Sequence, residues 1–187
     1  MLARSRETGL TLDDFLIIQG AFDMKILVYS PTSSPTKWTS SDLLSEHAPI
    51  PHRRVSSLDE LLAESDVVSL HCPLNDQTRE LMSAPEFARM KPSAIFLNTG
   101  RGGLVDEPAL IDALERNEIY GAGLDVLAHE PATLERYERL FRLENVVVAP
   151  HAGAGTHQVQ IDSCVVAVET CASYLKGEGI GRSKRVV

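Results

Sequence analysis

Short, continuously apolar runs recur along the chain, and the stretches between them space their apolar residues like one face of a helix. Each run has four to six residues, the length of a strand. Runs without polar alternation are typical of strands buried on both faces of a parallel sheet. The predicted strands are 25–29 (KILVY), 66–71 (DVVSLH), 94–98 (AIFLN), 121–126 (GAGLDV) and 146–149 (VVVA).

Helix-start signals lie between these runs. Ser57 and Ser83 are each followed three residues later by glutamate, the spacing of a capping box. Asp106 can cap a helix that has Pro108 in its first turn, where a missing N–H costs nothing. Apolar spacing predicts two further helices, over 12–22 and from about 156 to 175, and in the latter Cys164 and Cys171 are expected to be small core residues.

Strands that alternate with helices predict βαβ crossovers and therefore an α/β protein with a parallel sheet. In such folds ligands bind at the carboxyl ends of the strands, where the chain order switches. The residues after each predicted strand are therefore the first place to look for chemistry.

Composition narrows the function classes. The formal net charge of −8 argues against a nucleic-acid partner, which needs an excess of Lys and Arg. Three cysteines without a CxxC pair suggest neither a disulfide framework nor a metal site. No apolar run approaches the length of a membrane span, and no secretory signal is recognisable, so we expect a cytoplasmic protein.

Charged side chains follow three of the predicted strands. Arg101 lies in a glycine-rich turn after 94–98, Asp125 and Glu130 stand at and after the end of 121–126, and His151 follows 146–149. Taken singly, the plainer interpretation is favoured: a surface arginine at Arg101, a loop at Glu130 and a helix-entry histidine at His151. Their joint occurrence at strand ends favours one site.

The sequence resembles the D-isomer-specific 2-hydroxy-acid dehydrogenases from about Ala21 to the C-terminus. The stretches that carry the resemblance are AFDMKILVYSP, LLAESDVVSLHCPLNDQTRELM, MKPSAIFLNTGRGGLVDEPALIDAL, GAGLDVLAHEP and NVVVAPHAGAGT. It implies a Rossmann-type doubly wound parallel sheet and an NAD(P)-dependent oxidoreductase that acts on the CH–OH group of D-2-hydroxy acids, or reduces 2-keto acids such as glyoxylate and hydroxypyruvate.

The resemblance also implies roles for individual residues. Arg101 matches the arginine that holds the substrate carboxylate and polarises its carbonyl, and His151 matches the acid/base histidine. Glu130 matches its partner carboxylate, which favours the protonated imidazole. The positions that correspond to contacts with the cofactor are those of Ser30, Cys72, Pro73, Leu74, Thr78, Thr99, Gly100, Asp125, Gly153 and Ala154.

The amino-terminal part departs from the family pattern. A dinucleotide fold needs GxGxxG between its first strand and first helix, and counting back from Ser30 places that motif near residues 7–12, where only Gly9 fits. We therefore expect the first strand and phosphate loop to be incomplete or missing, with a divergent segment at 1–20 and the dinucleotide-binding domain at 21–187. The family's separate substrate domain is expected to be absent, which predicts a truncated form with little or no turnover.

Ser30 is a second departure, because relatives that use NAD commonly place Asp there for the ribose hydroxyls. Without that negative charge a 2′-phosphate is not repelled, and Thr32, Ser33 or Lys37 could contact it. The cofactor is therefore expected to be NAD or NADP, with a lean to NADP. The partners expected are a small 2-keto or 2-hydroxy acid and a second copy in a homodimer. The alternative function is a catalytically inactive dinucleotide-binding or regulatory module.

Overall fold

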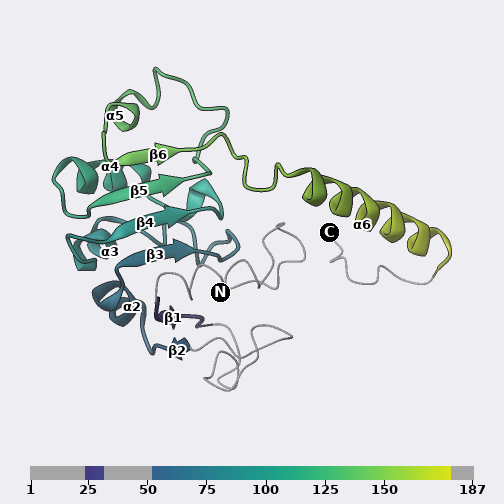
Figure 1. The fold of residues 1–187 in the computed structure, drawn as a ribbon, viewed down its shortest axis with the longest axis horizontal. Coiled ribbons are helices and arrows are strands. Elements are labelled where there is room, and N and C mark those ends of the chain that lie inside the picture. The colour runs from purple at the N-terminus through teal and green to yellow at the C-terminus, as the bar shows by residue number, and fades with distance from the viewer. Residues whose placement is uncertain (1–23, 32–51, 178–187) are drawn as a thin grey trace.

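The computed structural model describes residues 24–31 and 52–177 (Figure 1). In chain order its elements are β1 (Ile26–Val28), β2 (His52–Arg54), α2 (Leu58–Glu64), β3 (Val67–Leu70), α3 (Ala84–Arg89), β4 (Ile95–Asn98), the 3-10 turn η1 (Gly102–Leu104), α4 (Glu107–Glu115), β5 (Gly121–Leu124), α5 (Glu138–Phe141), β6 (Val146–Val148) and α6 (His157–Leu175). The predicted helix over 12–22, the region around Gly9 and the loop of Thr32 to Lys37 lie outside the described residues.

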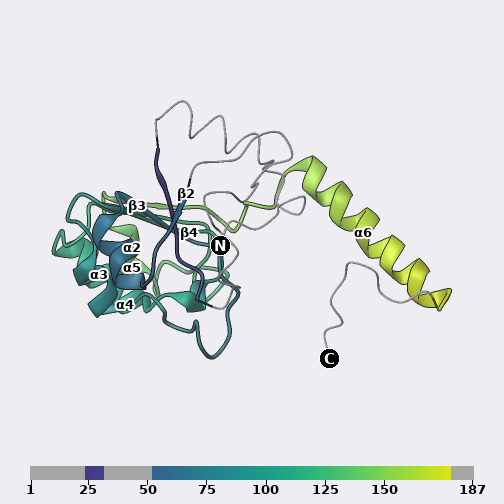
Figure 2. The ribbon, with the colours of Figure 1, turned by 90° about the horizontal axis from the view of Figure 1, so that it is seen from below.

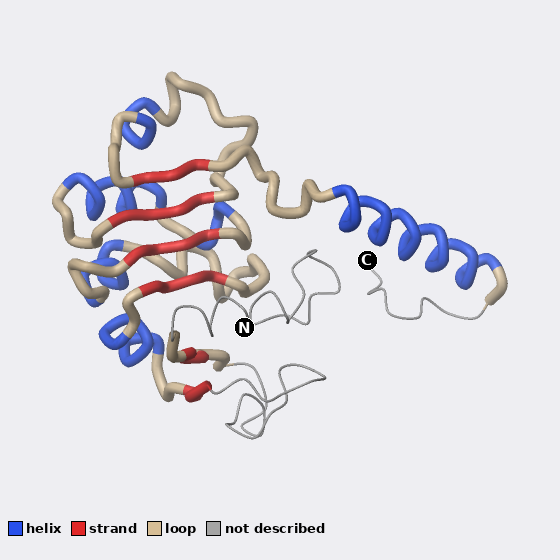
Figure 3. The backbone as a smooth tube through the Cα atoms, viewed as in Figure 1, coloured by secondary structure: helices blue, strands red, loops and turns tan. Residues whose placement is uncertain are grey.

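All the described strands pair in parallel. β3, β4, β5 and β6 form one four-stranded sheet in that order, and β1 pairs with β2 in a separate ladder (Figure 3). The five predicted strands are confirmed, each slightly shorter than its apolar run. β2 was not predicted, because its sequence, HRR, lacks an apolar run. The α/β fold with a parallel sheet is thus the one that the sequence indicates.

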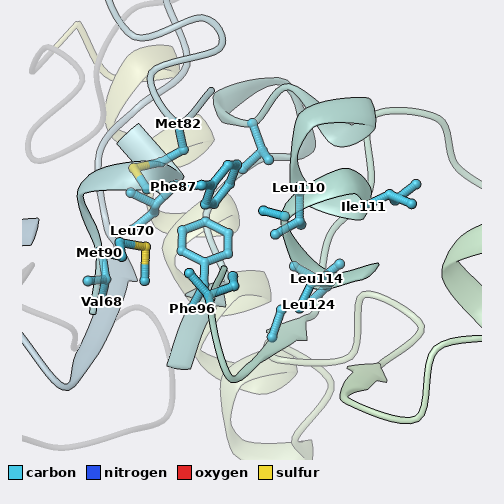
Figure 4. Close-up of a cluster of buried hydrophobic side chains, with 14 of the residues drawn as sticks. Val68, Leu70, Met82, Phe87, Met90, Phe96, Leu110, Ile111, Leu114 and Leu124 are labelled. Carbon is cyan, nitrogen blue, oxygen red and sulfur yellow. The ribbon is translucent and has the colours of Figure 1, made fainter. Parts of the chain in front are cut away.

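Helices α2, α3 and α4 lie on one side of the four-stranded sheet (Figure 2). The strands turn alternate side chains toward them, so that Val68, Phe96 and Leu124 are buried. Phe87 of α3 meets Phe96 edge-on, with ring centroids 5.4 Å apart, in the middle of this core (Figure 4). The sheet is therefore anchored by a continuous apolar layer that leaves the strand ends free to carry loops.

Helix α6 is an exception to this packing. It leads away from the sheet (Figures 1 and 2), and Val159 is its only buried residue. Cys164 and Cys171 are exposed, so the expectation that they are core residues is wrong. The prediction failed because the helical spacing of apolar residues identifies an amphipathic face but not the surface against which it packs.

The two predicted capping boxes have different outcomes. At Ser83 the box is confirmed, and the Glu86 carboxylate accepts a hydrogen bond from the Ser83 backbone N–H at 3.2 Å. At Ser57 the side-chain oxygen accepts from the Glu60 N–H at 3.1 Å, but the Glu60 carboxylate accepts from the backbone N–H and hydroxyl of Ser56, at 2.9 and 2.8 Å. Glu60 therefore reaches one residue further back than a capping box requires.

The pKa of Glu60 is lowered to about 2, first by the Ser56 hydrogen bonds and then by Arg53. A carboxyl group with a depressed pKa stabilises the folded state above its ordinary value of 4.5, and this stabilisation is lost as the pH falls toward about 2. We expect Glu60→Gln to lower the free energy of unfolding at neutral pH, by an amount that shrinks over this interval. Urea unfolding at a series of pH values measures the difference.

Glu144→Gln is the matched control. Glu144 is exposed, and within the described part of the chain it makes no hydrogen bond or ion pair. It should show no such pH dependence. A Glu60→Gln deficit that stayed constant from neutral pH to pH 2 would contradict the assignment.

Candidate active site

Every predicted site residue lies after the carboxyl end of a strand. Ser30 follows β1, the segment from Cys72 to Thr78 follows β3, and Arg101 follows β4. Asp125 and Glu130 follow β5, whereas His151, Gly153 and Ala154 follow β6. Since the strands are parallel, those after β3 to β6 meet at one edge of the sheet (Figure 1).

The turn after β4 is built by a buried amide. Asn98 is only 1% exposed, and its side-chain oxygen accepts from the Gly100 N–H while its amide nitrogen donates to the Arg101 carbonyl, at 3.1 and 3.0 Å. Arg101 itself is exposed, and its guanidinium donates to the Gly100 carbonyl. The turn therefore presents a cation at the sheet edge.

The loop after β5 lies directly against this turn. A Cβ atom on Gly102 would fall 2.0 Å from the Leu127 carbonyl carbon and 2.3 Å from the Ala128 nitrogen, a separation that only glycine permits. The contact fixes the loop that carries Glu130 relative to the turn that carries Arg101. Arg101 is close enough to contribute to the lowering of the Glu130 pKa.

Glu130 and His151 form a hydrogen-bonded pair. His151 Nδ1 lies 2.7 Å from one Glu130 oxygen, and the Leu127 N–H donates to the other at 2.9 Å. These bonds, that of His151 first, lower the pKa of the Glu130 carboxyl below its usual value. An ionised carboxylate stabilises a proton on a neighbouring imidazole ring, the arrangement required of an acid/base histidine.

Asp125 holds the turn that carries His151. Its two oxygens accept from the N–H groups of Ala152 and Gly153 at 2.7 and 2.9 Å. A Cβ atom on Gly153 would lie 2.7 Å from the Asp125 carboxylate, so a larger residue would break this clamp. His151 has φ 53°, in the left-handed region that is unfavourable for most side chains, and the Asp125 bonds help to maintain it.

The segment after β3 forms a compact turn. The Thr78 hydroxyl donates to the Pro73 carbonyl at 2.6 Å and accepts from the Asn75 N–H at 2.9 Å. Burial raises the pKa of the half-buried Cys72 thiol, which therefore remains protonated and is a poor nucleophile. The turn is suited to contacts with a ligand rather than to covalent chemistry.

The β1–β2 ladder contributes a separate pocket. A cavity of about 400 Å³ is lined by Tyr29, Ser30, Pro31, Arg54, Val55 and Ser56. The Arg54 guanidinium donates to the Ser30 carbonyl at 2.8 Å, so a cation lies beside the residue where relatives commonly place an aspartate. Arg54 was missed in the sequence, because β2 was not recognised as a strand and its end was not examined.

Comparison with known proteins identifies the family. The sequence profile of the NAD-binding domain of D-isomer specific 2-hydroxyacid dehydrogenases matches residues 15–153. The chain belongs to this family. Glyoxylate/hydroxypyruvate reductase B from Shigella boydii is 47% identical over 125 residues, which are 67% of this chain and 38% of that protein. The match therefore covers less than half the length of this relative.

Comparison with solved structures supports the same family assignment. A glyoxylate reductase from Paecilomyes thermophila superposes with a TM-score of 0.75 at 30% identity, over 90% of this chain and 47% of the other. The NAD-complexed D-isomer specific 2-hydroxyacid dehydrogenase from Lactobacillus delbrueckii gives 0.72 at 32% identity, over 89% of this chain and 50% of the other. The domain thus has the Rossmann-like fold of this family's NAD-binding domains.

The described residues fit the nicotinamide end of such a cofactor. Asp125 supplies carboxylate oxygens, which suit the N–H groups of a carboxamide, and Gly153 and Ala154 leave the neighbouring backbone accessible. The phosphate-binding region predicted near residues 7–12 lies outside the described part of the chain. Over residues 24–31 and 52–177 there is no cluster that could hold a metal and no helix long and apolar enough to cross a membrane.

The close approach at Gly102 gives a stability prediction. Gly102→Ala should reduce the free energy of unfolding by about 1–3 kcal/mol, because rigid backbone on both sides must move. Gly103→Ala is the control, since the added methyl would meet only the ends of the flexible Leu74 and Arg79 side chains. Urea titration of both variants measures the difference, and equal effects would show that the Leu127 contact is not what excludes a side chain.

Proposed function

We propose that this chain carries the catalytic and nicotinamide-binding site of an NAD(P)-dependent oxidoreductase that reduces small 2-keto acids such as glyoxylate or hydroxypyruvate, and oxidises the corresponding D-2-hydroxy acids. The observation that supports this most directly is the His151–Glu130 pair, 2.7 Å apart at the sheet edge that also carries Arg101. The names of the relatives agree in substrate class.

Arg101 would bind the substrate carboxylate, since its planar fork matches two oxygens and its charge polarises an adjacent carbonyl. His151, with Nδ1 bonded to Glu130, would use Nε2 to give a proton to the keto oxygen during reduction and to remove it during oxidation. Glu130 would stabilise the protonated ring. The nicotinamide, when bound, supplies the hydride.

Replacing the acid/base residue tests this assignment. His151→Asn should lower any rate of glyoxylate-dependent NAD(P)H oxidation that the unmodified chain shows, by about 100- to 10,000-fold. Asparagine tolerates the positive φ of position 151, so the turn should be kept. Arg101→Lys should chiefly raise KM, because the bidentate contact is lost. His157→Asn, at an exposed histidine on α6, is the control and should retain activity.

A rate unaffected by His151→Asn would contradict the mechanism. Thermal stabilisation by the cofactor without any keto-acid turnover would instead support the second candidate, a catalytically inactive dinucleotide-binding or regulatory module.

The homodimer that the family resemblance implies stays a prediction, which light scattering coupled to size-exclusion chromatography would test.

We propose further that NADP is preferred over NAD. Ser30 replaces an acidic residue, and Arg54 supplies a positive charge in the same pocket. NADPH should therefore stabilise the chain in thermal melts at lower concentration than NADH. Arg54→Gln should weaken the binding of NADPH by at least about tenfold, because a charge-assisted hydrogen bond to the 2′-phosphate is lost. The binding of NADH should change little.

Arg53→Gln is the matched control, since Arg53 lies on the same strand but is not among the residues that line the pocket, and its guanidinium binds Glu60 and Glu64 of α2. It removes the same charge and should keep the NADPH preference. Equal or tighter binding of NADH by the unmodified chain would remove the proposal.

A further inference from the structure

We propose that Glu107 and Tyr137 are positioning residues, which together hold the loop 127–130 so that Glu130 stays against His151. This inference rests on the proposed function only for the role of the Glu130–His151 pair in proton transfer. Neither residue lies among those that the family resemblance implies for the site.

Three successive backbone N–H groups of the loop donate to side-chain oxygens. The Leu127 N–H donates to Glu130 at 2.9 Å, and the Ala128 N–H donates to Glu107 at 2.7 Å. The His129 N–H donates to the Tyr137 hydroxyl at 3.0 Å. The loop path is therefore set by side chains, two of which come from outside it.

The two outside groups are linked to each other. The Tyr137 hydroxyl donates to a Glu107 oxygen at 3.0 Å while it accepts from His129. Tyr137 is only 3% exposed, and the pKa of its hydroxyl is raised, first by burial and also by the negative charge of Glu107. The phenol thus keeps its proton and serves as donor and acceptor at once.

Glu107 connects the loop to the part of the chain that carries Arg101. It is the first residue of α4, which begins shortly after the Arg101 turn and the 3-10 turn η1. Gly102 of that turn lies against Leu127 and Ala128. Glu107 therefore fastens by hydrogen bonds the same two segments that Gly102 brings into contact.

Loss of the Tyr137 hydroxyl would leave the His129 N–H and one Glu107 oxygen without this partner. An unsatisfied, partly buried N–H is unfavourable, so the loop would shift to find another acceptor. Glu130 lies one residue beyond His129, and a shift there would weaken its hydrogen bonds to His151 and Leu127. Those two bonds are the main causes of its lowered pKa.

Tyr137→Phe tests the proposal, because it removes the hydroxyl and keeps the ring. The carboxyl pKa of Glu130 is followed by carbon-13 NMR titration of the full chain, with the signal assigned by its disappearance in Glu130→Gln. We expect Tyr137→Phe to raise this pKa toward its usual value, because the hydrogen bonds to the carboxylate are weakened. Glu107→Ala should raise it as well, and Glu107→Gln less, because the amide oxygen can still accept from Ala128.

Phe141→Leu is the matched control. It disturbs the packing of the Tyr137 ring, whose centroid lies 6.1 Å from that of Phe141, and leaves the hydroxyl bonds in place. It should not change the Glu130 pKa, even if it lowers stability. An equal shift in Phe141→Leu and Tyr137→Phe would reduce the role to packing and overturn the proposal.

An unchanged Glu130 pKa in folded Tyr137→Phe would also overturn it. Should that variant fail to fold, the comparison of Glu107→Ala with Glu107→Gln decides in the same way. The titration requires no turnover, so its outcome is separate from that of the keto-acid assays.

Discussion

The parallel register of β4, β5 and β6 is the constraint from which the candidate active site follows. Asn98, Leu124 and Val148 pair across the three strands, and bonds from the Asp125 and Ala149 N–H groups extend the ladder by one step. The chain therefore leaves all three strands at the same level. The loops that follow the three strands therefore lie side by side although they are far apart in the sequence. The buried apolar layer fixes the register of the strands.

Carboxylates organise the loops at this edge. Asp125, Glu107 and Glu130 each accept at least one backbone N–H from a loop after β5 or β6. Hydrogen bonds to ionised acceptors are stronger than those between neutral groups, which suits loops that lack secondary structure. Glu130 both organises its loop and pairs with His151, so the local fold and the proposed chemistry depend on the same charge.

The sequence predicted the strands and the residues at their ends, but not the contacts between the loops. Continuous apolar runs located the five confirmed strands, and residues at their ends led to Arg101, Asp125 and His151. The β2 strand was missed because it is polar, and α5 because its four residues are too short to show a period. Contacts such as that of Glu107 with Ala128, 21 residues apart, depend on loop paths that no spacing rule specifies. Arg54 was missed because β2, the strand on which it lies, was not predicted.

Helix α6 has consequences for how the chain loses its structure. It has 19 residues, but only Val159 is buried, so almost none of its backbone hydrogen bonds are protected by packing on the sheet. Its sequence is rich in Val, Ile and Thr, whose helix propensity is low, and most helical stability in proteins comes from tertiary packing, which α6 largely lacks. We therefore expect α6 to open independently of the sheet and α2 to α4. Proteolytic nicking within α6 would proceed from a locally opened state, while the hydrophobic layer around Phe96 remained intact.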